Sequence, residues 1–181
     1  MMKNIENRES FLWIGFLCLI SLWAIEICAQ GKSASATADV TVTIVSPIGI
    51  EKKSDLRFGD IVGGKGGGVV SVEAENSILL RGAVSLGPSN GKSVSTAKFL
   101  ITGSPHATYT IVLPLSLTLT RQGGSEVLIM DEIQSTPFET GRLSNKGEQT
   151  VTVGGTIHIE ENQPIGIYES PEGLSVTVSY Q

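Results

Sequence analysis

Hydrophobic and polar residues alternate strictly along one early part of this chain. Alanine, valine or isoleucine occupies every second position from 34 to 44, and serine, threonine or aspartate fills the positions between them. A period of two with β-branched residues predicts an extended strand that has one apolar face and one solvated face. We therefore expect this ribbon to bury its apolar face against a sheet.

The rest of the chain repeats short runs rich in Val, Ile, Thr and Leu, with Gly, Pro, Asn and Ser between them. This pattern predicts an all-β sandwich or barrel. Pro114 should interrupt one run, because proline lacks the N–H that a central strand donates, and Gly154 with Gly155 should bend or divide another. The expected strands are 38–46, 69–73, 78–86, 98–102, 108–120, 126–133, 150–159 and 174–180.

Three glycine-containing stretches predict connections. Residues 63–68 should form a flexible loop, Asn90 with Gly91 a hairpin turn, and 145–147 another turn. GPSNGKS, starting at Gly87, has three residues before its Gly-Lys pair, where a phosphate-binding loop has four. Because a strand-like pattern follows it in place of a helix, we interpret it as a hairpin connection.

The N-terminus has the features of an export signal. Residues 11–25 form an apolar run that is shorter than the roughly 20 residues of a membrane-spanning helix, and Lys3 and Arg8 precede it. With Ala29 at the cleavage point, we expect a signal peptide at 1–29 and a single domain at 30–181. The mature protein would then be in the periplasm, at the cell surface or outside the cell, with no stable membrane span.

Two alternatives concern this N-terminus. Cleavage near Ala36 or Ala38 would shorten the mature chain. A lipid anchor at Cys28 is the other alternative, although Ile27 is bulky for the position before a lipid-modified cysteine.

Composition narrows the function classes. Both cysteines, Cys18 and Cys28, fall within the expected signal, so the mature fold has no disulfide and depends on its apolar core. The formal net charge of −5, without basic runs, argues against nucleic acid as a partner.

No arrangement of residues suggests catalysis, a metal ion or another cofactor. His106 and His158 are isolated from each other and from cysteine, which does not give a zinc spacing. Asp131 and Glu132 are adjacent in an expected strand, so their carboxylates should point to opposite faces and not share a cation. We expect a protein that assembles or binds and is not an enzyme.

Three segments carry a resemblance to a known family: TADVTVTIVSPIGIEKKSDLRFGDIV, FLITGSPHATYTIVLP and GIYESPEGLSVTVSYQ. In this order they resemble secreted bacterial proteins of the domain of unknown function 4402 family. The pattern is also similar to immunoglobulin-like subunits of bacterial surface fibres. That likeness implies an antiparallel immunoglobulin-like sandwich whose N-terminal strand completes a neighbouring subunit. It also implies identical or related subunits and a periplasmic chaperone as partners.

The resemblance assigns roles to two alternating sets of residues. The strand-donating set would be Ala36, Ala38, Val40, Val42 and Ile44. The C-terminal set, which the chaperone would grip, would be Leu174, Val176, Val178 and Tyr180. The chain departs from many fibre subunits, because its mature part lacks a cysteine pair and 170–173 interrupt the approach to the last strand.

The residues leave other functions open. The alternating segment could be the first strand of a complete sandwich, folded within its own chain. The protein would then be a monomeric secreted binding module whose loops at 63–68 or 90–92 contact a ligand. A hydrolase with a dispersed site is a third class.

Overall fold

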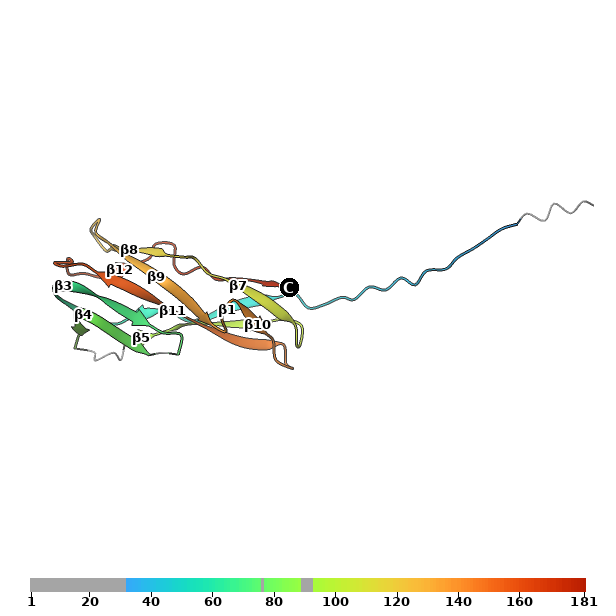
Figure 1. Cartoon of the computed structure of the whole chain (residues 1–181), viewed down its shortest axis with the longest axis horizontal. Coiled ribbons are helices and arrows are strands. Elements are labelled where there is room, and N and C mark those ends of the chain that lie inside the picture. The colour runs from blue at the N-terminus through green and yellow to red at the C-terminus, as the bar shows by residue number, and fades with distance from the viewer. Residues whose placement is uncertain (1–31, 76, 89–92) are drawn as a thin grey trace, which may run out of the picture. The chain divides into compact units, whose positions relative to one another are not determined.

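The computed structural model describes residues 32–75, 77–88 and 93–181 (Figure 1). Thr43–Gln181 forms one compact unit, and the described residues before it belong to a separate unit. The expected signal peptide and its cleavage site lie outside the described residues. Among the described residues, no helix is long and apolar enough to cross a bilayer.

The compact unit consists of antiparallel strands, which confirms the all-β prediction. One sheet has eight strands in the order β1-β6-β11-β9-β8-β12, with β3 added to β11 and β4 to β3. A second sheet has the order β10-β7-β13, and β2 pairs with β5. The strands are β1 (Gly49–Ser54), β2 (Arg57–Phe58), β3 (Ile61–Val72), β4 (Ile78–Leu86), β5 (Val94–Ser95), β6 (Ala97–Thr102), β7 (Thr108–Val112), β8 (Leu117–Arg121), β9 (Val127–Thr136), β10 (Thr140–Arg142), β11 (Glu148–Ile159), β12 (Tyr168–Glu169) and β13 (Thr177–Tyr180).

The large sheet branches at the middle of β11. One edge of this strand pairs with β6 over 148–153 and with β3 over 155–159, while its other edge pairs with β9. Gly154 lies at the branch point, where a Cβ atom would collide with the backbone of Val72, Glu73 and Ala74. The strand continues through Gly154 and Gly155 with a bulge against β9, so the expected bend takes the form of a bulge.

The first core lies where the three-stranded sheet covers β6 and the first half of β11. Tyr109 of β7 is completely buried there, and its hydroxyl donates a hydrogen bond to Oε1 of Gln149 at 2.9 Å. Burial raises the pKa of Tyr109 to about 12. The buried members of this core are Ala97, Phe99, Ile101, Tyr109, Ile111, Leu143, Val151 and Val153.

The second core lies on the other half of the large sheet and has less cover. Its buried residues are Val70, Met130 and Ile157, from β3, β9 and β11. The half-buried residues around it come from β2, β3, β4, β8, β9, β11 and the chain at Leu56. Among the described residues, this cluster includes none from β7, β10 or β13. The three-stranded sheet therefore does not cover this core, and its cover comes partly from Leu56 and from Phe58 of β2.

Several predicted elements are confirmed. The strand at 78–86 matches β4, and the run at 108–120 is split around Pro114 into β7 and β8. Residues 145–147 form the expected turn, with Gly147 at φ 75°.

One predicted connection is wrong in form. Residues 63–68 belong to β3, where they make an irregularity in its pairing with β4 and do not form a free loop. Asn90 and Gly91 lie outside the described residues.

The predicted strand at 38–46 is also wrong. Residues 32–48 contain neither helix nor strand, and 32–47 are exposed. The described residues of this ribbon therefore pair with no strand of the three sheets.

Candidate functional site

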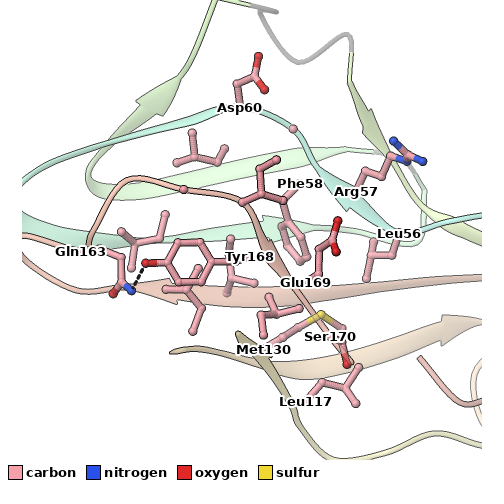
Figure 2. Close-up of a pocket in the computed structure, with 18 of the residues that line it drawn as sticks. Leu56, Arg57, Phe58, Asp60, Leu117, Met130, Gln163, Tyr168, Glu169 and Ser170 are labelled. Atoms are coloured by element: carbon pink, nitrogen blue, oxygen red, sulfur yellow. Dashed lines mark hydrogen bonds between the residues drawn. The ribbon is translucent and has the colours of Figure 1, made fainter. Parts of the chain in front are cut away.

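An open groove of about 1,380 Å³ lies over the second core (Figure 2). It is found where the three-stranded sheet ends, between the chain at 56–65 and the chain at 162–170. This volume exceeds the roughly 300–1,000 Å³ of a typical small-molecule pocket. The dimensions therefore suit a peptide segment better than a small ligand.

The floor of the groove is apolar because alternate residues of β8, β9 and β11 face it. Met130 and Ile157 are nearly buried, although the three-stranded sheet contributes no described residue to their cluster. The floor residues are Leu117, Leu119, Leu128, Met130, Ile157 and Ile159.

Aromatic and aliphatic side chains form the walls. Phe58 of β2 and Tyr168 of β12 point into the groove from opposite sides, and Met130 and Leu117 lie below them (Figure 2). The Tyr168 hydroxyl donates to the carbonyl of Pro164 at 2.7 Å and accepts from Nε2 of Gln163 at 2.8 Å. Since these bonds satisfy the hydroxyl, the ring of Tyr168 serves as an apolar surface.

Charges are confined to the rim and are mixed in sign. Lys52 pairs with Asp55 at 2.7 Å, and this hydrogen bond holds the pKa of Asp55 below its usual value. Arg57 approaches the other oxygen of Asp55 at 3.5 Å. No group of three or more His, Cys, Asp or Glu side chains able to hold a metal ion occurs among the described residues. The groove can therefore accept an apolar strand, with polar groups left at its rim.

The N-terminal segment, residues 34–44, presents the complementary chemistry. Its large apolar side chains are almost fully accessible, at 95% for Val40, 83% for Val42 and 92% for Ile44. Large apolar side chains arranged on one side of an extended ribbon are costly to leave in water. The valine and isoleucine members of the predicted donating set are therefore exposed.

The predicted C-terminal set is brought together at the edge of the three-stranded sheet. Val178 and Tyr180 belong to β13, and Leu174 and Val176 precede it. All four are half-buried and pack against the first core, and Leu174 also lines the groove. The large residues of the N-terminal set are therefore exposed, whereas the C-terminal set packs against the first core.

Three residues, Ser46, Ser104 and Tyr180, form a hydrogen-bonded clasp at the base of the N-terminal segment. The Tyr180 hydroxyl donates to the carbonyl of Ser46 at 2.8 Å and accepts from the N–H of Ser104 at 2.8 Å. The N–H of Ser46 donates to Oγ of Ser104 at 3.0 Å. Gly103 makes room for this hydroxyl, since a Cβ atom there would collide with it.

The adjacent carboxylates of β9 lie on one face of the sheet, contrary to prediction. Asp131 contacts Nε2 of His158 at 2.9 Å, and Glu132 accepts from the hydroxyl of Thr156 at 3.0 Å. His158 and Thr156 are two residues apart on β11 and share a face. Glu132 has a φ of 45° at the bulge, and this backbone conformation turns both carboxylates the same way.

Sequence reasoning named the two terminal sets but missed the floor of the groove. Alternation at 126–133 indicates that Leu128 and Met130 share a face. It does not show that a groove lies over them, because that depends on how distant strands pair.

A family model described as "Domain of unknown function (DUF4402)" matches residues 48–180. The matched range contains the groove and the C-terminal set, and it begins after the N-terminal segment. Comparison with curated proteins and with solved structures gives no match.

Proposed function

The chain belongs to the DUF4402 family, and we propose that it is an exported structural or adhesive component of a bacterial envelope that assembles by β-strand addition. In this process an extended segment adds a strand to an incomplete sheet or sandwich. Main-chain hydrogen bonds supply affinity, and pockets for alternate side chains fix the register. Identical or related subunits would be the partners, and a periplasmic chaperone would protect the subunit before assembly.

One observation carries this proposal. The N-terminal segment combines a strict alternation of apolar residues with nearly complete exposure of Val40, Val42 and Ile44. A strand that belonged to its own sandwich would bury this face. An exposed, one-sided apolar face is what a donated strand would offer a partner, and this supports the proposal.

The energetic argument follows from burial. Covering a valine or isoleucine side chain contributes roughly 1.5–3 kcal/mol. Three such side chains on one face could offset much of the entropy that ordering the segment costs. An apolar segment of this kind is therefore suited to strong association with a partner.

Truncation tests the proposal. We compare mature chain 30–181 with a version that lacks residues 30–45 and so begins at Ser46. The shorter chain should fold with a free energy of unfolding within about 0.5 kcal/mol of the longer one, because 32–45 contribute no strand and no buried side chain. Urea unfolding measures this.

Analytical ultracentrifugation of the same two proteins measures assembly. Chain 30–181 should form oligomers as its concentration rises, and the truncated chain should stay monomeric. A chain 30–181 that stays monomeric at high concentration would contradict the proposal and favour the monomeric binding module. Unfolding of the truncated chain would instead mean that the segment belongs to its own core.

A further inference from the structure

Two edge strands meet at the clasp and leave a gap at their other ends. Each has one partner among the described strands, because β1 pairs with β6 and β13 pairs with β7. Near one end, the hydrogen bond from Tyr180 to Ser46 ties them together. Toward the other end, Lys52 and Leu174 line the groove. The space between β1 and β13 is therefore closed at the clasp, and at its other end it opens into the groove.

The apolar side chains of the N-terminal segment match the apolar floor of the groove in chemistry and in spacing. An extended strand rises about 3.3 Å per residue, so Val40, Val42 and Ile44 would place side chains on the floor about 6.6 Å apart. Thr41 and Thr43 would face solvent at the polar rim. The backbone of the segment could pair with the chain at 174–176, which lies in no strand.

The segment cannot place all three of these residues in the groove of its own chain. It is rooted at Ser46, whereas the groove begins at about Lys52, six residues further along an extended path. At about 3.3 Å per residue this separation is roughly 20 Å. A segment that turned back at its root would use residues 41–45 to cover that distance, so that only Val40 of the three would reach the start of the groove. The small side chains of Ala34, Ala36 and Ala38 would then be left to meet the floor.

The clasp also opposes such a reversal. Both backbone groups of Ser46 are already bonded, the N–H to Ser104 and the carbonyl to Tyr180. Pro47 has no N–H to donate and holds Ser46 in an extended conformation. A hairpin at this point would have to break the clasp.

We propose that the groove accepts the N-terminal segment of a second copy of this chain, with Val40, Val42 and Ile44 on the floor. Tyr180 acts as a positioning residue that keeps each segment away from its own groove. This inference rests on the proposed function and identifies the acceptor surface within it.

Disulfide trapping tests the acceptor, because residues 30–181 contain no cysteine. We introduce Val42→Cys and Leu119→Cys into one chain, confirm its fold by circular dichroism, oxidise it and examine it on a non-reducing denaturing gel. A disulfide forms when the two Cα atoms come within about 4.4–6.8 Å. We expect a ladder of linked chains. A fast-migrating monomer, in which the two cysteines of one chain have formed a disulfide with each other, would overturn the inference.

The control pairs Val42→Cys with Thr118→Cys, which lies next to Leu119 on β8 but is exposed. We expect at least tenfold less linked chain from this pair. If Leu119→Cys prevents folding, Ile165→Cys at the groove rim replaces it, since Ile165 is 98% exposed. A folded, assembling protein that gives no ladder from either groove position would overturn the inference while leaving strand addition intact. Failure of the unmodified chain to assemble would contradict the proposed function itself.

Adding Tyr180→Phe to the Val42→Cys and Leu119→Cys chain tests the clasp. The substitution removes the hydroxyl that binds Ser46 and Ser104 and leaves the ring in place. We expect a several-fold increase in internally closed monomer relative to the ladder, with the circular dichroism spectrum unchanged. An unchanged ratio would show that Tyr180 does not position the segment.

Discussion

Replacing Val40 and Val42 together by aspartate is expected to abolish assembly while leaving the compact unit folded. Both side chains are exposed, at 95% and 83%, so the free energy of unfolding should change by less than about 0.5 kcal/mol. In an assembled chain they would lie on an apolar floor. There each valine contributes roughly 1.5–3 kcal/mol, and a carboxylate without a partner is strongly disfavoured. The association constant should fall by at least about a hundredfold, as measured by sedimentation equilibrium.

The matched control changes the other face of the same ribbon. Thr41→Asp with Thr43→Asp adds the same charge within the same stretch, on positions that would face solvent. This protein should assemble within about threefold of the unmodified chain at 0.15 M salt, where exposed charges are screened. Equal loss of assembly in both double variants would show that charge matters and the apolar face does not.

Replacing Gly154 by alanine is expected to have the largest effect on stability. A Cβ atom there would collide with the backbone where β3 ends, at Val72, Glu73 and Ala74. Backbone cannot move aside without breaking the pairing of β3 with β11. We expect a loss of about 3 kcal/mol in the free energy of unfolding, the upper part of the range for overpacked sites, from urea denaturation.

The neighbouring glycine provides the control. At Gly155 a Cβ atom would meet the Cε methyl of Met130 at 2.9 Å, which is the flexible end of a side chain. Gly155→Ala should therefore cost about 1 kcal/mol or less. Similar losses from both substitutions would argue against a branch point that depends on Gly154.

Local signals in the sequence predicted much of the sheet. Pro114 separates β7 from β8 because a missing N–H acts on the strand that contains it. The runs that became β4, β6 and β9 are rich in aliphatic residues and could be assigned from their own composition. Because residues 30–181 contain no cysteine, the sequence alone also predicts that this part of the chain has no disulfide.

Predictions failed where pairing between distant residues decides the outcome. Residues 63–68 resemble a loop by composition, yet they extend β3 because β4 lies beside them. Asp131 and Glu132 should alternate in a regular strand, but the bulge opposite β11 turns both carboxylates to one face. Neither outcome is encoded in the neighbouring residues alone.

The sequence by itself determined the all-β class, most strand positions and the one-sided apolar face of the N-terminal segment. These are local properties, set by side-chain alternation and by the backbone limits of proline and glycine. Only the tertiary structure decided that residues 63–68 extend β3, that a groove opens beside Phe58 and Tyr168, and that Tyr180 fastens Ser46. Those outcomes depend on which distant strands pair, and the alternation of a segment does not specify its partner.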